Sequence, residues 1–141
     1  MCNSGQVRLF QEDIRTVDLP EENYDITLAA MVLHHLRDDK DWENTFSKLF
    51  RLTAPGGSLW IADFVAHENP QVQKNMWGRY GKYLEKLGGP AYREKVFAYI
   101  DKEDSPRPLT YQLELLRKVG YNKVEILHKN TCFVAFGAIK E

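Results

Sequence analysis

Two apolar segments and one amphipathic segment dominate the first half of the chain. Residues 24–33 (YDITLAAMVL) form a nearly continuous apolar run. Such a run fits a strand covered on both faces, as in parallel sheets, although the run alone leaves a buried helix open. Residues 58–65 (SLWIADFV) predict a second buried strand. Between the two, residues 38–53 carry an apolar stripe at helical spacing, formed by Trp42, Phe46, Leu49 and Phe50. This stripe predicts a helix, and Pro55-Gly56-Gly57 is expected to end it.

The segments on either side continue this alternation. Residues 7–10 predict a short strand, and residues 66–108 predict a helical insertion whose first helix ends at Gly88-Gly89-Pro90. A last helix is predicted from an N-cap at Thr110 to Gly120. Two strands then follow at 124–127 and 131–139, and their short connection requires antiparallel pairing. The order predicts one α/β domain over residues 1–141.

Composition and charge narrow the classes of function. Nineteen basic and twenty acidic residues give a net charge of −1, which argues against dedicated nucleic-acid binding. The first residues have no basic region followed by an apolar run, and no apolar stretch approaches the roughly 20 residues of a membrane span. Cys2 and Cys132 lack any metal-binding spacing. We therefore expect a cytoplasmic protein without a membrane partner.

Several strings in this order resemble a known family. EDI (12–14) precedes YDITLAAMVLHHL by about ten residues, a helix and LTAPGGSLWIADF follow, and KVGYNKVEILHKNTCFVAFGAIK ends the chain. Together they are similar to the C-terminal part of a class I S-adenosylmethionine-dependent methyltransferase. The resemblance implies a Rossmann-like methyltransferase sheet that is truncated, with its first two strands missing, and that closes in a C-terminal antiparallel hairpin.

The resemblance also implies a cofactor site. The family's acidic residue at the end of the third strand, which binds the adenine amino group, falls on Asp13, and the next residue, whose backbone meets the ring, is Ile14. The tip of the fourth strand, which approaches the methionine part of the cofactor, falls on Ala29, Ala30 and Met31. A carboxylate accepting from an exocyclic amino group is chemically sound. Asp13 capping a loop is the structural alternative.

Other residues are candidates for the acceptor side. In the family the insertion commonly covers the substrate pocket, so we expect residues 66–108 to act as a lid. Asp63, Tyr80 and Arg93 are then candidate substrate contacts, and Arg79 is a further anion contact. The adjacent His34 and His35 should point apart in a regular strand or helix, so we expect no metal site there and assign no catalytic residue.

One family feature does not occur in these 141 residues. The glycines stand at 5, 56, 57, 78, 81, 88, 89, 120 and 137, and none forms the GxGxG-like turn that lets the backbone approach the cofactor. We therefore expect weak binding of S-adenosylmethionine, no useful activity of the chain alone, and self-association through the open edge of the strand at 24–33. The alternative is a non-catalytic remnant acting as a binding or assembly module. A short hydrolase lacks support because no GxSxG occurs.

Overall fold

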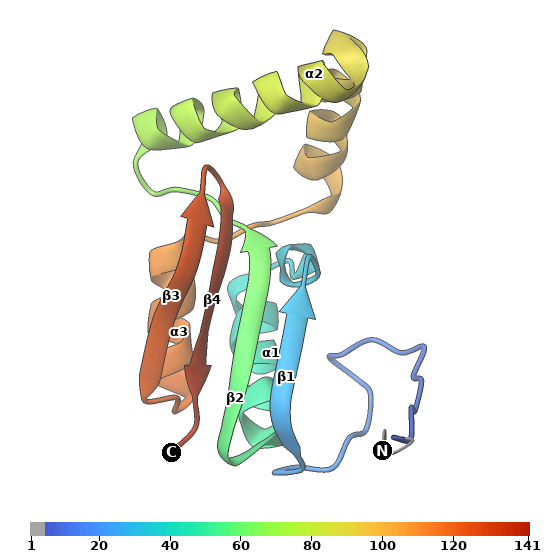
Figure 1. Cartoon of the computed structure of the whole chain (residues 1–141), viewed down its shortest axis with the longest axis vertical. Helices are drawn as coiled ribbons and strands as arrows, with labels where there is room; N and C mark the ends of the chain where they lie inside the picture. Colours follow the sequence, from blue (N-terminus) through green and yellow to red (C-terminus); the bar gives the residue numbers. More distant parts are fainter. Residues whose placement is uncertain (1–4) are drawn as a thin grey trace.

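The computed structural model of the protein describes residues 5–141 (Figure 1). Its elements in chain order are β1 (Tyr24–Ala30), the 3₁₀ turn η1 (Leu33–His35), α1 (Asp39–Leu52), β2 (Thr53–Phe64), α2 (Pro70–Glu103), α3 (Leu109–Val119), β3 (Lys123–Asn130) and β4 (Phe133–Ile139). Within the described residues, none of the helices combines the length and apolar character that a bilayer span requires.

The strands form one mixed sheet in the order β1-β2-β4-β3. β1 and β2 are parallel, and Ile26 lies opposite Ser58. β4 is antiparallel to both β2 and β3, which confirms the predicted C-terminal hairpin. The turn of that hairpin lies at Thr131 and Cys132, after the predicted connection at residues 128–130, and Thr131 has a left-handed φ of 55°. The predicted α/β class and the helix between the two parallel strands are also confirmed.

Helices α1 and α3 cover one face of the sheet and enclose the main core (Figure 1). The stripe predicted on α1 supplies Trp42, Phe46 and Leu49 to this core, and Asp38 caps the helix by accepting a hydrogen bond from the backbone of Asp41. Gly120 ends α3 with a φ of 122°, as predicted, but its N-cap is Pro108 rather than Thr110. The apolar periodicity therefore located the helices, and only the start of α3 was misplaced.

The opposite face of the sheet is open beside β1 (Figure 1). Ile26 and Leu28 are 65% and 75% exposed, whereas Ala29, which points to the other face, is buried. The prediction that the run at 24–33 is covered on both faces is therefore wrong. The physical reason is that α1 and α3 pack on the same side of the sheet, so only alternate residues of β1 meet the core.

The predicted strand at residues 7–10 does not form, which is a second correction. Val7 and Leu9 are 84% and 92% exposed, and this segment contributes no strand to the sheet. A β-strand is stabilised by hydrogen bonds to a neighbour and by side chains packed on at least one face. Residues 7–10 have neither of these, so their β-propensity alone does not form a strand.

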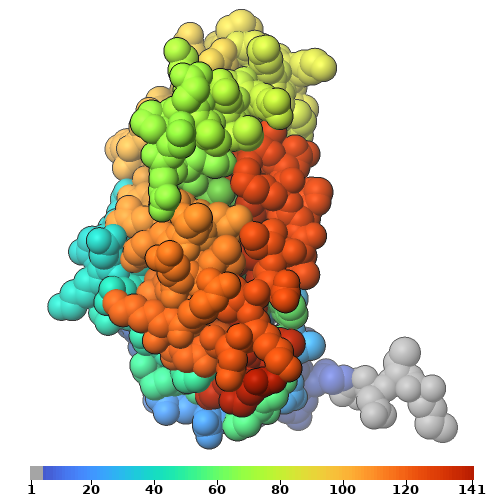
Figure 2. All heavy atoms as spheres, turned by 90° about the vertical axis from the view of Figure 1, so that its left-hand side faces the viewer, coloured from blue at the N-terminus to red at the C-terminus, as the bar shows by residue number. Residues whose placement is uncertain are grey.

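The insertion is a pair of helices joined at a sharp kink. Gly89 has φ 82° and ψ 177° within α2, just before Pro90, where the sequence predicted that the first helix would end. The pair lies across the carboxyl ends of β1 and β2 (Figure 1). A second apolar cluster anchors it there, because Phe64 and Cys132 of the sheet region pack with Ile100 of α2. In the space-filling view of Figure 2, the hairpin and α3 form the flank below the insertion.

Candidate functional site

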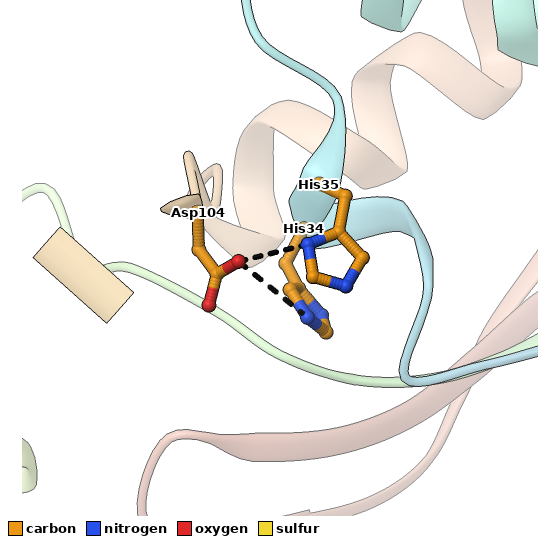
Figure 3. Close-up of side chains that lie close together, drawn as sticks. All are labelled: His34, His35 and Asp104. Atoms are coloured by element: carbon orange, nitrogen blue, oxygen red, sulfur yellow. Dashed lines mark ion pairs between the residues drawn. The ribbon is translucent and has the colours of Figure 1, made fainter. Parts of the chain in front are cut away.

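Four titratable side chains meet where β1 and β2 end beneath the insertion. His34 and His35 lie on η1 just after β1, Asp63 lies near the end of β2, and Asp104 follows the last turn of α2. Figure 3 shows His34, His35 and Asp104 facing one another. Ligands of open α/β sheets collect at this edge, because the carboxyl ends of neighbouring strands leave a crevice there.

Asp63 holds η1 against the sheet. Its carboxylate accepts hydrogen bonds from the backbone N–H groups of Leu33 (3.0 Å) and His34 (3.2 Å) and from His34 Nδ1 (2.5 Å). The side chain is 2% exposed. Asp63 was predicted as a polar contact for substrate, and the structure instead directs its carboxylate to the chain itself. Its role is to position His34.

The two histidines do not point apart. Their ring centroids are 4.2 Å from each other, so the geometric reason for expecting separate side chains fails. Adjacent side chains diverge in a regular strand or α-helix, but η1 is a single 3₁₀ turn and Leu36 after it is already extended. Both rings therefore point to the same side, where they meet a third group that no spacing in the sequence indicates.

That third group is Asp104. Its Oδ1 lies 2.8 Å from His35 Nδ1 and 4.0 Å from His34 Nε2. The side chain is 2% exposed, yet Oδ1 has no partner with hydrogen-bond geometry among the described residues. Asp104 lies 69 residues after His35, in the connector KEDSPRP, where no motif marks it. Only the folding of α2 back onto the sheet brings it to the histidines.

A cavity of about 440 Å³ adjoins this cluster, and it is lined by Gln73, Trp77, Phe97, Ile100, Asp101, Asp104 and Pro106. Two of its lining residues carry buried polar atoms without a partner, Asp104 Oδ1 and Trp77 Nε1. Buried polar groups are normally hydrogen-bonded, because an unmade bond costs about 1–3 kcal/mol. A donor and an acceptor left unpaired beside one cavity indicate that it suits a ligand with polar groups.

Tyr80 and Arg93 do not line this cavity, although both pack on side chains that do. Tyr80 and Arg79 line a different cavity of about 550 Å³ between α2 and the hairpin, and burial raises the pKa of Tyr80. Arg93 is paired with Glu85 at 2.6 Å and lies over the ring of Phe97, 5.6 Å from its centroid. The structure therefore does not bring Asp63, Tyr80 and Arg93, the three predicted substrate-side residues, into one cavity.

The predicted cofactor residues come from two segments, the turn at Asp13 and the tip of β1. Asp13 lies in a turn and accepts hydrogen bonds from the backbone (2.8 Å) and guanidinium (2.6 Å) of Arg15, which lowers the pKa of Asp13 to about 2. Ile14 packs against the main core. At the tip of β1, Ala29 is buried, while Ala30 and Met31 are exposed. Met31 has a φ of 53°, and its N–H donates to the Ala62 carbonyl (2.8 Å).

These residues fit S-adenosylmethionine in part. Asp13 is ionised at neutral pH and exposed, and can accept from an adenine amino group, although Arg15 already occupies both of its oxygens. The exposed tip of β1 offers backbone and one apolar side chain. The remaining contacts of a complete cofactor site, above all a glycine-rich turn, have no counterpart in the 141 residues.

Comparison with known proteins gives consistent matches. Residues 2–61 match a family model described as a methyltransferase domain. An uncharacterized methyltransferase of Mycobacterium tuberculosis is 31% identical over 74 residues, which are 52% of this chain and 34% of that protein. The match thus spans about a third of the relative's length.

Solved structures agree on the fold. Human N-acetylserotonin methyltransferase in complex with S-adenosylmethionine superposes with a TM-score of 0.57 at 22% identity, covering 93% of this chain and 33% of that one. A S-adenosylmethionine-dependent methyltransferase of Thermotoga maritima gives 0.57 at 20% identity, covering 96% and 65%. At these identities the likeness concerns the fold. Residues 2–61 thus resemble a methyltransferase domain in sequence, and the described residues share their fold with S-adenosylmethionine-dependent methyltransferases.

Proposed function

We propose that this domain transfers a methyl group from S-adenosylmethionine to a small-molecule acceptor bound in the cavity beside Asp104. The observation that carries the proposal is the cavity's position at the carboxyl ends of β1 and β2, together with its unpaired donor on Trp77. S-adenosylmethionine supplies an activated methyl group when bound, so the protein's main task is to hold the acceptor in line with it. We also propose a cytoplasmic location, on the sequence features given above.

In this proposal the insertion acts as the predicted lid. Trp77 and Phe97 of α2 pack edge to face at 5.5 Å and form an apolar wall of the cavity. An apolar wall excludes water, which would otherwise compete for the polar groups of an acceptor. The indole Nε1 of Trp77 can then donate to an oxygen or nitrogen of the acceptor.

A ligand-detected NMR titration with simple phenols and aromatic amines tests the cavity. Trp77→Phe removes the donor and keeps an aromatic ring, so binding should weaken, while Trp60→Phe on β2, away from the residues that line the cavity, should leave it unchanged. Equal binding by the wild-type chain and Trp77→Phe would remove Trp77 from the acceptor site.

We further propose that the 141-residue chain alone binds S-adenosylmethionine weakly and is inactive. A hydrogen bond to a charged group contributes about 1.5–3 kcal/mol, so the loss of the contacts that a glycine-rich turn makes costs several kcal/mol of affinity. Isothermal titration calorimetry of a homogeneous sample should show no binding at micromolar cofactor. A micromolar dissociation constant would overturn this part of the proposal.

If millimolar cofactor does bind, the Asp13 contact can be tested directly. Asp13→Ala should weaken binding by about 1–3 kcal/mol, or roughly 5- to 150-fold. Asp18→Ala, an exposed aspartate on the same segment, is the matched control and should have no effect. An unchanged affinity for Asp13→Ala would exclude Asp13 from the site.

The second candidate is a non-catalytic binding or assembly module. The exposed apolar face of β1, with Ile26 and Leu28, favours it. The same calorimetry separates the two functions, because a module of this kind should associate with protein while showing no saturable heat even at millimolar S-adenosylmethionine.

A further inference from the structure

We infer that His34, His35 and Asp104 form a binding site for one divalent transition-metal ion, with Zn²⁺ as the representative ion. The three side chains offer one ligand atom each, and these atoms lie within 4.8 Å of one another. Two imidazoles and one carboxylate are a donor set that suits zinc, cobalt and nickel. The inference concerns these residues alone and does not depend on methyl transfer.

The distances are close to those that a bound ion requires. Zinc binds imidazole nitrogen and carboxylate oxygen at about 2.0–2.2 Å, so ligand atoms of a tetrahedral site lie roughly 3.4 Å apart. The two separations from Asp104 Oδ1 fall on either side of this value, at 2.8 Å to His35 Nδ1 and 4.0 Å to His34 Nε2. Side-chain movements of roughly half an ångström would equalise them.

Asp63 prepares His34 for this role. It accepts the proton of His34 Nδ1 at 2.5 Å, so the lone pair of the neutral ring is on Nε2, the atom that faces Asp104. A metal-bound histidine characteristically donates its other N–H to a carboxylate, which fixes the tautomer and the ring orientation. Asp63 therefore acts as a positioning residue, and its backbone contacts to Leu33 and His34 hold the whole turn.

The state of Asp104 distinguishes a metal site from an ordinary ion pair. Its side chain is 2% exposed, and Oδ1 has no hydrogen-bond partner among the described residues, because the contact with His35 is short but poorly aligned. An ion between the three ligands would satisfy this oxygen. Three protein ligands also leave a fourth tetrahedral position open, and Asp104 lines the cavity toward which that position can face.

The test is Zn²⁺ calorimetry on the 141-residue chain, with Co²⁺ absorption as a second readout of coordination. A Cys2→Ser background removes a competing thiol. We expect one ion per chain. Asp63 would hold a metal ligand rather than the ion itself, so Asp63→Asn should weaken Zn²⁺ binding by roughly 10- to 100-fold. His35→Ala and Asp104→Asn each change a direct ligand and should weaken it by more than that.

Matched controls use the same residue types outside the cluster. His128→Ala on β3 and Asp18→Asn in the loop before β1 change exposed side chains, and these variants should bind Zn²⁺ as the wild-type chain does. His35 is 50% exposed, so its removal should leave the circular dichroism spectrum and thermal melt unchanged. The inference is overturned if the wild-type chain binds no ion, or if folded His35→Ala and Asp104→Asn bind it as tightly as the wild-type chain.

Discussion

The exposed side of β1 leads to a prediction about association. β1 is an edge strand, and Ile26 and Leu28 on its open face are 65% and 75% exposed. Natural edge strands are usually protected by charge, proline or a covering segment. The other edge of the sheet follows this rule, because β3 carries Lys123, Glu125 and Lys129. We therefore predict that the chain self-associates through β1, and that Leu28→Lys prevents it.

The size of the effect follows from the exposed fraction. Full burial of a leucine or isoleucine side chain contributes about 1.5–3 kcal/mol, so covering the exposed part of Leu28 contributes about 1–2 kcal/mol. A symmetric dimer buries Leu28 from both chains, and the variant would lose about 2–4 kcal/mol, or roughly 30- to 1,000-fold in the dissociation constant. The folded monomer should change by less than about 0.5 kcal/mol, since the side chain is largely exposed.

Size-exclusion chromatography with light scattering measures this directly. The wild-type chain should give a mass above 16.4 kDa that falls on dilution, and Leu28→Lys should shift it to the monomer. Leu127→Lys on β3, where the replaced leucine is 61% exposed, is the matched control and should behave as the wild-type chain. A wild-type chain that elutes as a 16.4 kDa monomer and melts cooperatively would refute the reasoning.

Two further predictions concern local structure. The carboxyl of Asp13 should titrate near pH 2 by NMR, and Arg15→Ala should return its pKa toward 3.8. Because the folded pKa is lowered, the stability that this pair contributes is present above pH 3.8 and is lost as the pH falls toward 2. A normal pKa of Asp13 in the wild-type chain would contradict the contact. Gly89→Ala should destabilise the chain by about 1–3 kcal/mol in urea unfolding, because φ 82° with ψ 177° is a conformation that only glycine adopts readily. The matched control is Gly78→Ala on the same helix, where an added methyl group meets open space, and it should stabilise the chain by about 0.5–1 kcal/mol. Equal effects of the two glycine variants would show that the kink is not held as described.

The sequence predicted correctly those elements whose apolar side chains all face one neighbour, because their spacing then follows the period of the element. The stripe of Trp42, Phe46 and Leu49 located α1, because a helix on a sheet buries one face and the spacing records it. The short connection between the last two strands required their antiparallel pairing. The apolar content of a segment was less informative, because it does not show whether another strand or helix packs against that segment. That is why residues 7–10 and the outer face of β1 were predicted wrongly.

The cluster of titratable groups lay beyond what sequence spacing can predict. His34 and Asp63 are 29 residues apart, and Asp104 lies 41 residues after Asp63. They meet because three separate chain segments end at one edge of the sheet. The sequence shows that His34 and His35 are adjacent, but adjacent side chains point apart only in a regular strand or α-helix. In the single 3₁₀ turn η1 their rings lie close together.

The two halves of the candidate site differ in how firmly the fold holds them. His34, Asp63 and Asp104 have side chains at most 6% exposed and are fixed by β1, β2 and α2, which the sheet and its two apolar clusters hold in place. Asp13 instead has an exposed side chain bound to Arg15, although its turn is anchored by Ile14, which packs against the main core, and by the buried Val17. The proposed metal site therefore uses buried side chains that the core holds in place, whereas the proposed cofactor contact uses an exposed carboxylate that Arg15 already engages.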